Sequence, residues 1–257
     1  MGLFDAFKKK ECSVCGGEIG LLGNRKLEDG NLCKNCAAKL SPYFSDRRRS
    51  TVAEIQQQLD YREQNKQAVA AFRVTRSLGR DTKVLLDEDA GKFMVTRARN
   101  LEEANPDVLD FSQVTGCDMD VEEHTSEEKR RDKDGNMVSY IPPRYEFSYD
   151  FNLVIRVNHP YFDQISFQLN SSDVDLNRGN PLPMMRKPDP RMNPDYREYE
   201  TMGKEIKQAL TSARRQAREE ARQAAAPKQA VTCPWCGATT TPDASGCCEY
   251  CGGSVNG

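Results

Sequence analysis

Apolar residues at every second position mark the middle of the chain as rich in strands. The longest such run covers residues 145–157, and the same period returns in shorter runs at residues 84–86, 93–95, 117–121 and 165–169. A period of two is typical of strands that bury one face and expose the other. We therefore expect an α+β protein whose centre is an antiparallel sheet or a partly closed barrel.

Polar and turn-forming residues separate these strands. Residues 87–91 and the sequence Asp134-Gly135-Asn136 each predict the tip of a hairpin, and the second hairpin is long and charged. Cys117 falls on the apolar side of its strand, which favours a buried small side chain over a reactive thiol. The carboxylates on the other side are interpreted as a solvated sheet face rather than as metal ligands: Asp118, Asp120, Glu122 and Glu123.

Helical patterns flank the strands on both sides. Thr51 and Glu54 form a capping box, so a first helix is expected over residues 52–72, with a thin apolar stripe. A proline-rich stretch then precedes a second helix over residues 196–225. Its bulky apolar residues end at Leu210, so we expect its first half to pack on the sheet and its second half to be a solvated arm.

Composition and charge narrow the class of protein. The chain has 257 residues, ten cysteines and two histidines, and no stretch approaches the roughly 18 apolar residues of a membrane span. Residues 81–176 are strongly acidic between basic segments, which argues against a phosphate-binding surface on the strand-rich body. Since no export signal is recognised, the cysteines indicate a reducing, cytoplasmic location and bound metal rather than disulfides.

The cysteines of the N-terminal segment have the spacing of a zinc site. Cys12-x2-Cys15 is followed after 17 residues by Cys33-x2-Cys36. Each pair makes a tight turn that presents two thiolates, and two pairs complete the tetrahedral four-sulfur shell that zinc prefers. A hairpin turn at residues 29–31 and a short helix after Cys36 give a treble-clef-like order of knuckle, hairpin and helix.

A second set of four cysteines lies near the C-terminus. Cys233-Pro-Trp-Cys236-Gly and Cys248-Glu-Tyr-Cys251-Gly share one pattern, so they predict the two matched knuckles of a small zinc ribbon. Cys247 competes with Cys248 for the third ligand position, and the spacing to Cys251 favours Cys248. Because four sulfurs leave no open coordination position, we interpret both zinc ions as structural and not catalytic.

These residues carry a resemblance to a known family. Met1-Gly2-Leu3-Phe4, the finger from Glu11 to Cys36, and Ser45-Asp46-Arg47-Arg48-Arg49-Ser50 resemble an uncharacterised bacterial family with an N-terminal four-cysteine zinc finger. The Cys-Pro-Trp-Cys-Gly-Ala ribbon occurs in similar proteins, and a strand-rich body closed by one helix is similar to bacterial pleckstrin-homology-like domains. The function of that family is unknown, so the resemblance implies zinc binding at the eight matched cysteines.

Together these signals predict five consecutive regions and a leading hypothesis. The regions are a four-cysteine finger (1–44), a helical connector (45–80), an antiparallel β domain (81–178), a proline-rich linker with a long helix (179–228) and a zinc ribbon (229–257). Neither His124 nor His159 has a nucleophile nearby in the sequence, and no glycine-rich phosphate loop is found. The hypothesis is a zinc-binding, non-enzymatic adaptor or scaffold that docks a protein partner and has no small-molecule substrate.

Two alternatives stay open for the partner. The two-17-two cysteine spacing is similar to that of GATA-type DNA-binding fingers, so nucleic acid is an alternative ligand, opposed by the acidic body. Its contacts would be Arg25, Lys26, Arg47, Arg48 and Arg49. The other alternative is an adaptor at the inner membrane surface, anchored by Leu3, Phe4 and Phe7, which share a helical face beside three lysines. We favour an apolar plug on the finger for these three residues.

Overall fold

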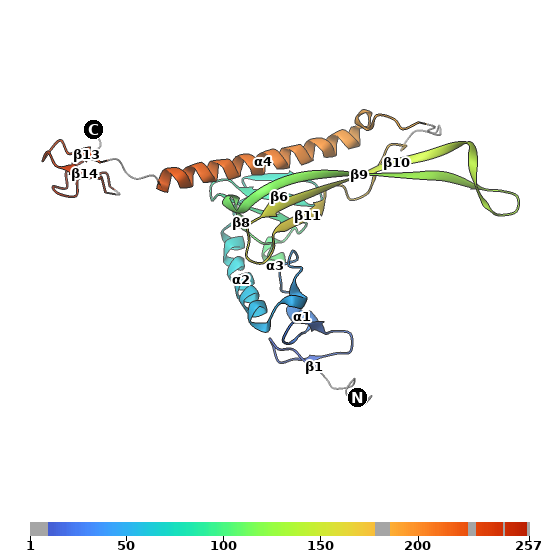
Figure 1. Cartoon of the computed structure of the whole chain (residues 1–257), viewed down its shortest axis with the longest axis horizontal. Coiled ribbons are helices and arrows are strands. Elements are labelled where there is room, and N and C mark those ends of the chain that lie inside the picture. The colour runs from blue at the N-terminus through green and yellow to red at the C-terminus, as the bar shows by residue number, and fades with distance from the viewer. Residues whose placement is uncertain (1–9, 178–185, 226–229, 244, 256–257) are drawn as a thin grey trace. The chain divides into compact units, whose positions relative to one another are not determined.

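The computed structural model of the chain describes residues 10–177, 186–225, 230–243 and 245–255. The predicted anchor of Leu3, Phe4 and Phe7 lies outside these residues. The chain divides into two compact units, Met1–Arg215 and Gln216–Gly257, and each is described by itself (Figure 1). No helix in the described segments is long and apolar enough to cross a membrane.

The first unit begins with a small four-cysteine module. Strand β1 (Lys10–Glu11) pairs with β2 (Glu18–Ile19), β3 (Arg25–Lys26) pairs with β4 (Asn31–Leu32), and helix α1 (Lys34–Ala37) follows. The bond from the Leu27 N–H to the Gly30 carbonyl, 2.9 Å, closes the hairpin predicted there. Leu27 and Leu32 are buried in a core of this module that also takes in Ile55 from the next helix.

Helix α2 (Val52–Ala71) begins where the capping box predicted. The Thr51 hydroxyl accepts from the Glu54 N–H, and the Glu54 carboxylate accepts from the Thr51 N–H at 2.7 Å. A 3-10 helix, η2 (Arg47–Arg49), precedes it. The expectation of a thin apolar stripe needs correction, because the buried face of α2 is polar in its middle. Its buried residues are Ile55, Gln58, Arg62, Asn65 and Val69.

A buried polar network, which we call the Asp107 network, joins the four-cysteine module, α2 and the body. The Asp107 carboxylate accepts hydrogen bonds from Arg62 Nη1 at 2.7 Å, from the Ser41 hydroxyl at 2.8 Å and from the Tyr61 hydroxyl at 3.2 Å. Asn65 donates to the side chain of Asn105 at 2.7 Å. Low dielectric surroundings strengthen such bonds and make the loss of one partner costly. Its members are Ser41, Tyr61, Arg62, Asn65, Asn105 and Asp107.

The body contains a first antiparallel sheet of four strands in chain order. They are β5 (Arg76–Gly79), β6 (Lys83–Asp87), β7 (Lys92–Thr96) and β8 (Leu109–Asp110). The predicted hairpin over residues 87–91 is confirmed as the link between β6 and β7. Helix α3 (Leu101–Ala104) lies between β7 and β8, and the 3-10 helix η3 (Phe111–Gln113) connects β8 to the next sheet.

A second antiparallel sheet is organised by one long hairpin. Strands β9 (Val114–Arg131) and β10 (Met137–Val157) run side by side (Figure 1), and β10 also pairs with β11 (Gln164–Gln168) and β12 (Val174–Asp175). The tip lies at the predicted Asp134-Gly135-Asn136, where Gly135 has a φ of +85°. The alternation predicted for residues 145–157 is confirmed from Phe147 to Val157, where every second side chain is buried, while Tyr145 is partly buried.

The described strands of the body form two separate four-stranded sheets and no closed barrel, so of the two predicted alternatives, an antiparallel sheet or a partly closed barrel, the structure has the sheet. Antiparallel pairing itself is confirmed. A barrel needs its edge strands to pair with each other. Here the edge strands β5 and β8 of the first sheet do not pair with the edge strands β9, β11 and β12 of the second.

Helix α4 (Pro194–Ala225) follows the short η4 (Pro190–Met192). As expected, its first half packs on the second sheet: the Tyr196 ring lies 5.0 Å from that of Phe151, and Ile206 and Leu210 are fully buried. A Cβ on Gly203 would lie 2.1 Å from Met119 Sδ, so any larger residue there would force the Met119 side chain to move. The second unit holds the end of α4 and a small ribbon of β13 (Val231–Thr232) and β14 (Thr239–Thr240).

Candidate metal centres

Three of the four Cys-x2-Cys pairs are built on the same turn. In each, the N–H of the first cysteine donates to the carbonyl of the residue five positions later. The N–H of the residue four positions later donates to the carbonyl of that same cysteine. The residue four positions after the first cysteine is a glycine with φ between +70° and +73°, a conformation that favours glycine. The turn therefore explains why glycine follows each second cysteine. The turns begin at Cys12, Cys233 and Cys248 and contain Gly16, Gly237 and Gly252.

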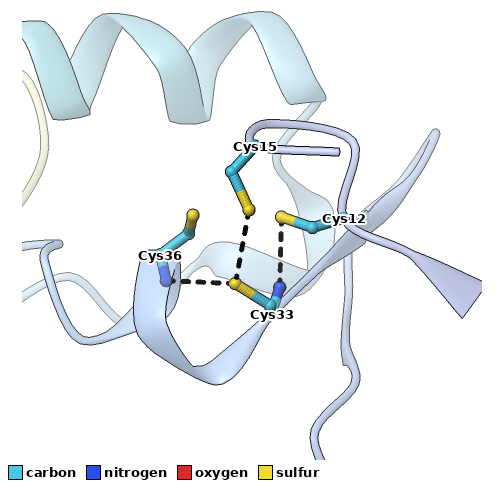
Figure 2. Close-up of side chains that lie close together, drawn as sticks. All are labelled: Cys12, Cys15, Cys33 and Cys36. Carbon is cyan, nitrogen blue, oxygen red and sulfur yellow. Dashed lines mark hydrogen bonds between the residues drawn. The ribbon is translucent and has the colours of Figure 1, made fainter. Parts of the chain in front are cut away.

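The fourth pair lies at the start of a helix instead. Cys33 is the N-cap of α1, and its sulfur accepts from the Cys36 N–H at 3.3 Å. The Cys33 N–H in turn donates to Cys12 Sγ at 3.3 Å, which joins the helix start to the first turn. Figure 2 shows the sulfurs of Cys12, Cys15, Cys33 and Cys36 turned toward one common point.

The distances between sulfurs match a four-coordinate metal site. Within each group of four, all Sγ atoms lie within 4.8 Å of one another. Individual separations are 3.8 Å for Cys15–Cys33, 3.6 Å for Cys233–Cys251 and 3.7 Å for Cys236–Cys248. Four sulfurs at about 2.3 Å from zinc in a regular tetrahedron are about 3.8 Å apart, whereas a disulfide is about 2.05 Å long. Both groups are thus positioned to hold a metal ion.

The pKa values of the thiols in the first group also favour a bound cation. Burial opposes ionisation of Cys12, but the backbone N–H groups of Cys15, Cys33 and Val14 outweigh it and lower its pKa to about 6. Burial and the three neighbouring sulfurs raise the pKa of Cys36. Thiolates this close repel one another, so they cannot all ionise unless a positive charge lies between them.

In the second group, too, one thiol has a lowered pKa and another a raised pKa. Burial opposes ionisation of Cys248, but the backbone N–H groups of Cys251 and Tyr250 lower its pKa to about 6. The Gly253 N–H favours the thiolate of Cys251, while contact with the sulfur of Cys236 and burial together raise its pKa to about 12. A dication among the four sulfurs would stabilise all four thiolates at once.

The structure places Cys248, and not Cys247, among the four. Cys247 lies outside the group: its N–H donates to Asp243 Oδ1 at 2.9 Å, and its sulfur lies 3.8 Å from the Ser245 carbonyl. The two cysteines are adjacent in sequence, so the turn beginning at Cys248 turns the sulfur of its neighbour away from the site.

The residues that the sequence argued against as metal ligands lie outside these two groups. Cys117 is buried, as its strand position predicted, and burial raises the pKa of its thiol to about 11. Asp118 forms ion pairs with Arg156 and Lys207. Glu123 forms an ion pair with Lys187. Among the described residues, the two cysteine groups are the sites where metal ligands gather.

Both histidines also have structural partners. His124 Nε2 lies 3.2 Å from Asp150 Oδ2. The His159 ring stacks on Phe162 with centroids 4.2 Å apart and lies edge-on to Tyr61. Burial lowers the pKa of His159, and Asp107 opposes that shift.

The cations of the predicted nucleic-acid surface fall into two groups. Arg49 forms an ion pair with Asp46 at 2.6 Å. The other four line a depression of about 640 Å³ that we call the basic hollow. Beside it, Leu21 and Leu22 are exposed, and sequence reasoning missed them because an apolar pair between two glycines fits neither period. The hollow is lined by Asn24, Arg25, Lys26, Leu27, Glu28, Arg47 and Arg48.

Comparison with known proteins gives a match only for the first module and the start of α2. A family model described as a domain of unknown function (DUF4428) matches residues 10–58. That segment contains the first cysteine group, the basic hollow and the start of α2. Comparison with curated proteins finds no match, and comparison with solved structures finds none either.

Proposed function

We propose that this chain is a non-enzymatic adaptor in which structural zinc holds a docking module at each end. The observation that carries the proposal is the closure of two four-sulfur shells at the spacing of a zinc tetrahedron. Four thiolates occupy every position of tetrahedral zinc, so no position is left for water or substrate. The role of the metal is therefore to fold the modules.

Energetics support a structural role for the metal. The first module has a core of a few side chains, and its strands have two residues each. The ribbon strands are equally short. Modules of this size bury too little apolar surface to fold alone. Zinc binding by such peptides supplies about 10–16 kcal/mol at neutral pH, enough to fold them.

The finer fold assignments belong to this proposal. The order of cysteine turn, β3–β4 hairpin and α1 supports a treble-clef type for the first module. Antiparallel sheets with the first half of α4 packed on one of them support a pleckstrin-homology-like type for the body. Reduced thiols throughout fit the cytoplasmic location expected from the sequence.

Exposed aromatic residues on the ribbon support docking to protein. Trp235 and Tyr250 occupy the same position in the two matched turns and are 75 % and 72 % exposed. The Trp235 indole N–H donates to the Ser254 carbonyl at 3.0 Å, which fixes the ring in place. Rigid, exposed Trp and Tyr are the residues most enriched at protein interfaces.

The test combines metal analysis with affinity capture. Purified full-length chain is expected to contain two zinc ions, and one or none would contradict the proposal. Capture from a lysate of the source organism should enrich the same protein repeatedly, and Trp235→Ala with Tyr250→Ala should abolish that enrichment. Met137→Ala and Met192→Ala are the control, because both side chains are exposed outside the zinc modules. Capture that survives loss of both aromatics would rule out docking through the ribbon.

A further inference from the structure

An apolar tip projects from the first module. Gly20-Leu21-Leu22-Gly23 connects β2 to β3, and the Gly23 N–H donates to the Gly20 carbonyl at 2.9 Å to close a tight turn. The side chains of Leu21 and Leu22, which we call the leucine tip, are 92 % and 93 % exposed. By contrast, Leu27 and Leu32 in the core of the same module are at most 1 % exposed. Two adjacent, fully exposed leucines contribute nothing to that core.

The basic hollow adjoins this tip. Arg25 belongs to the hollow, and its Nη1 donates to the Leu22 carbonyl at 3.4 Å, so the two features share a residue contact. Four cations line the hollow, and Glu28 is the one carboxylate among the lining residues. Across the described part of the chain, no ion pair neutralises Arg25, Lys26, Arg47 or Arg48.

Arg47 gives the hollow an unsatisfied donor. Its Nη1 is buried and has no hydrogen-bond partner in the described structure. Burial, followed by the charges of Arg25 and Arg48, lowers the pKa of Arg47. A buried donor without a partner costs free energy, and an anionic oxygen at this place would satisfy it and offset the repulsion.

We propose that the leucine tip and the basic hollow form a membrane-contacting site for anionic phospholipid. Leu21 and Leu22 enter the boundary between headgroups and acyl chains, and the cations of the hollow bind a lipid phosphate. Apolar side chains beside basic residues are the combination that holds peripheral proteins on anionic membranes. A nucleic-acid surface would instead place aromatic or polar side chains at the tip, because leucine neither stacks well on bases nor reads their edges.

This inference does not depend on docking of a protein partner, and its test uses the full-length chain. Binding is measured by sedimentation with vesicles of phosphatidylcholine alone and of phosphatidylcholine mixed with phosphatidylserine. We expect binding to the anionic vesicles only, weakened by salt. Leu21→Ser with Leu22→Ser should lower the partition coefficient about a hundredfold. Lys26→Gln with Arg48→Gln should lower it about thirtyfold.

Matched control variants distinguish vesicle binding at this site from nonspecific binding to vesicles. Ile141→Ser with Met192→Ser removes two apolar side chains elsewhere that are 96 % and 77 % exposed, and Arg73→Gln with Arg76→Gln removes two exposed cations of the body. Both pairs should bind vesicles as the unmodified chain does. Zinc content is measured in the same samples, so that loss of metal from the module is distinguished from loss of lipid binding.

Three outcomes would overturn the proposal. The first is no binding to anionic vesicles, and the second is binding that the leucine pair or the cation pair leaves unchanged. The third is equal loss in the test and control variants. Binding to duplex DNA that requires Lys26 and Arg48 but not the leucines, without vesicle binding, would assign the hollow to nucleic acid instead.

Discussion

Replacing Asp107 with alanine is expected to destabilise the first unit strongly. The Asp107 side chain is 0 % exposed and its partner Arg62 is 9 % exposed, with Nη1 and Oδ1 2.7 Å apart. Asp107→Ala leaves the guanidinium buried without a counter-charge, which costs about 3–5 kcal/mol. The hydroxyls of Ser41 and Tyr61 also lose their acceptor. We therefore expect a loss of about 5 kcal/mol in the free energy of unfolding.

The chain supplies an exposed ion pair with the same N–O distance as a control. Lys66 and Glu63 lie on the same helix at the same N–O distance, 2.7 Å, but are 55 % and 65 % exposed. Exposed pairs contribute about 0–1 kcal/mol, so Lys66→Gln should change little. The double variant Arg62→Met with Asp107→Leu removes both charges and should recover much of the stability lost in Asp107→Ala.

Thermal unfolding of the full chain, followed by circular dichroism, measures the difference. For a unit of this size, about 5 kcal/mol corresponds to a decrease in Tm of about 10 to 20 °C. A decrease no larger than that of Lys66→Gln would refute the reasoning. The Asp107 network would then contribute no more to the free energy of unfolding than a surface ion pair does. Its burial would not increase that contribution.

Four further predictions follow from the sites. Cys248→Ser should lose the second zinc in a chelator titration while Cys247→Ser retains it, and equal loss would refute the matched-knuckle assignment. Cys117→Ser should keep both zinc ions by metal analysis, since its thiol lies outside both groups. Truncation after residue 227 should leave the Tm of the first unit nearly unchanged, whereas a large decrease would mean that the ribbon stabilises it. Because burial lowers the pKa of His159 below its ordinary 6.5, the unfolded chain binds that proton more readily than the folded one. Stability should therefore fall from neutral pH to about pH 5.5, and His159→Phe should reduce that fall in urea titrations.

Local signals in the sequence predicted the parts of the fold that local chemistry determines. The Thr51–Glu54 cap, the turns at residues 87–91 and 134–136, and the alternation of β10 each depend on neighbouring residues. The eight cysteines were grouped correctly because each pair forms one short turn. In these cases residues only a few positions apart contain the whole interaction.

The parts that were missed depend on residues far apart in sequence. The sequence did not indicate the polar buried face of α2, because the partners of Arg62 and Asn65 lie 45 and 40 residues away at Asp107 and Asn105. Strand β5 buries only Leu78, so its sequence shows no alternation. The period of two in β9 and β10 fixes which side chains share a face, but not whether their sheet also pairs with β6 and β7.

The hairpin of β9 and β10 is a part of the fold that can gain or lose residues between related chains. Toward its tip, β10 pairs only with β9 among the described residues, so residues 128–131 and 137–144 have an open edge on each side of the hairpin. Frequent charges along such edges discourage pairing with other chains. Adding or deleting two residues on each strand keeps every inward side chain on its face. Related chains can therefore carry longer or shorter versions of this hairpin without any repacking of the body beneath it.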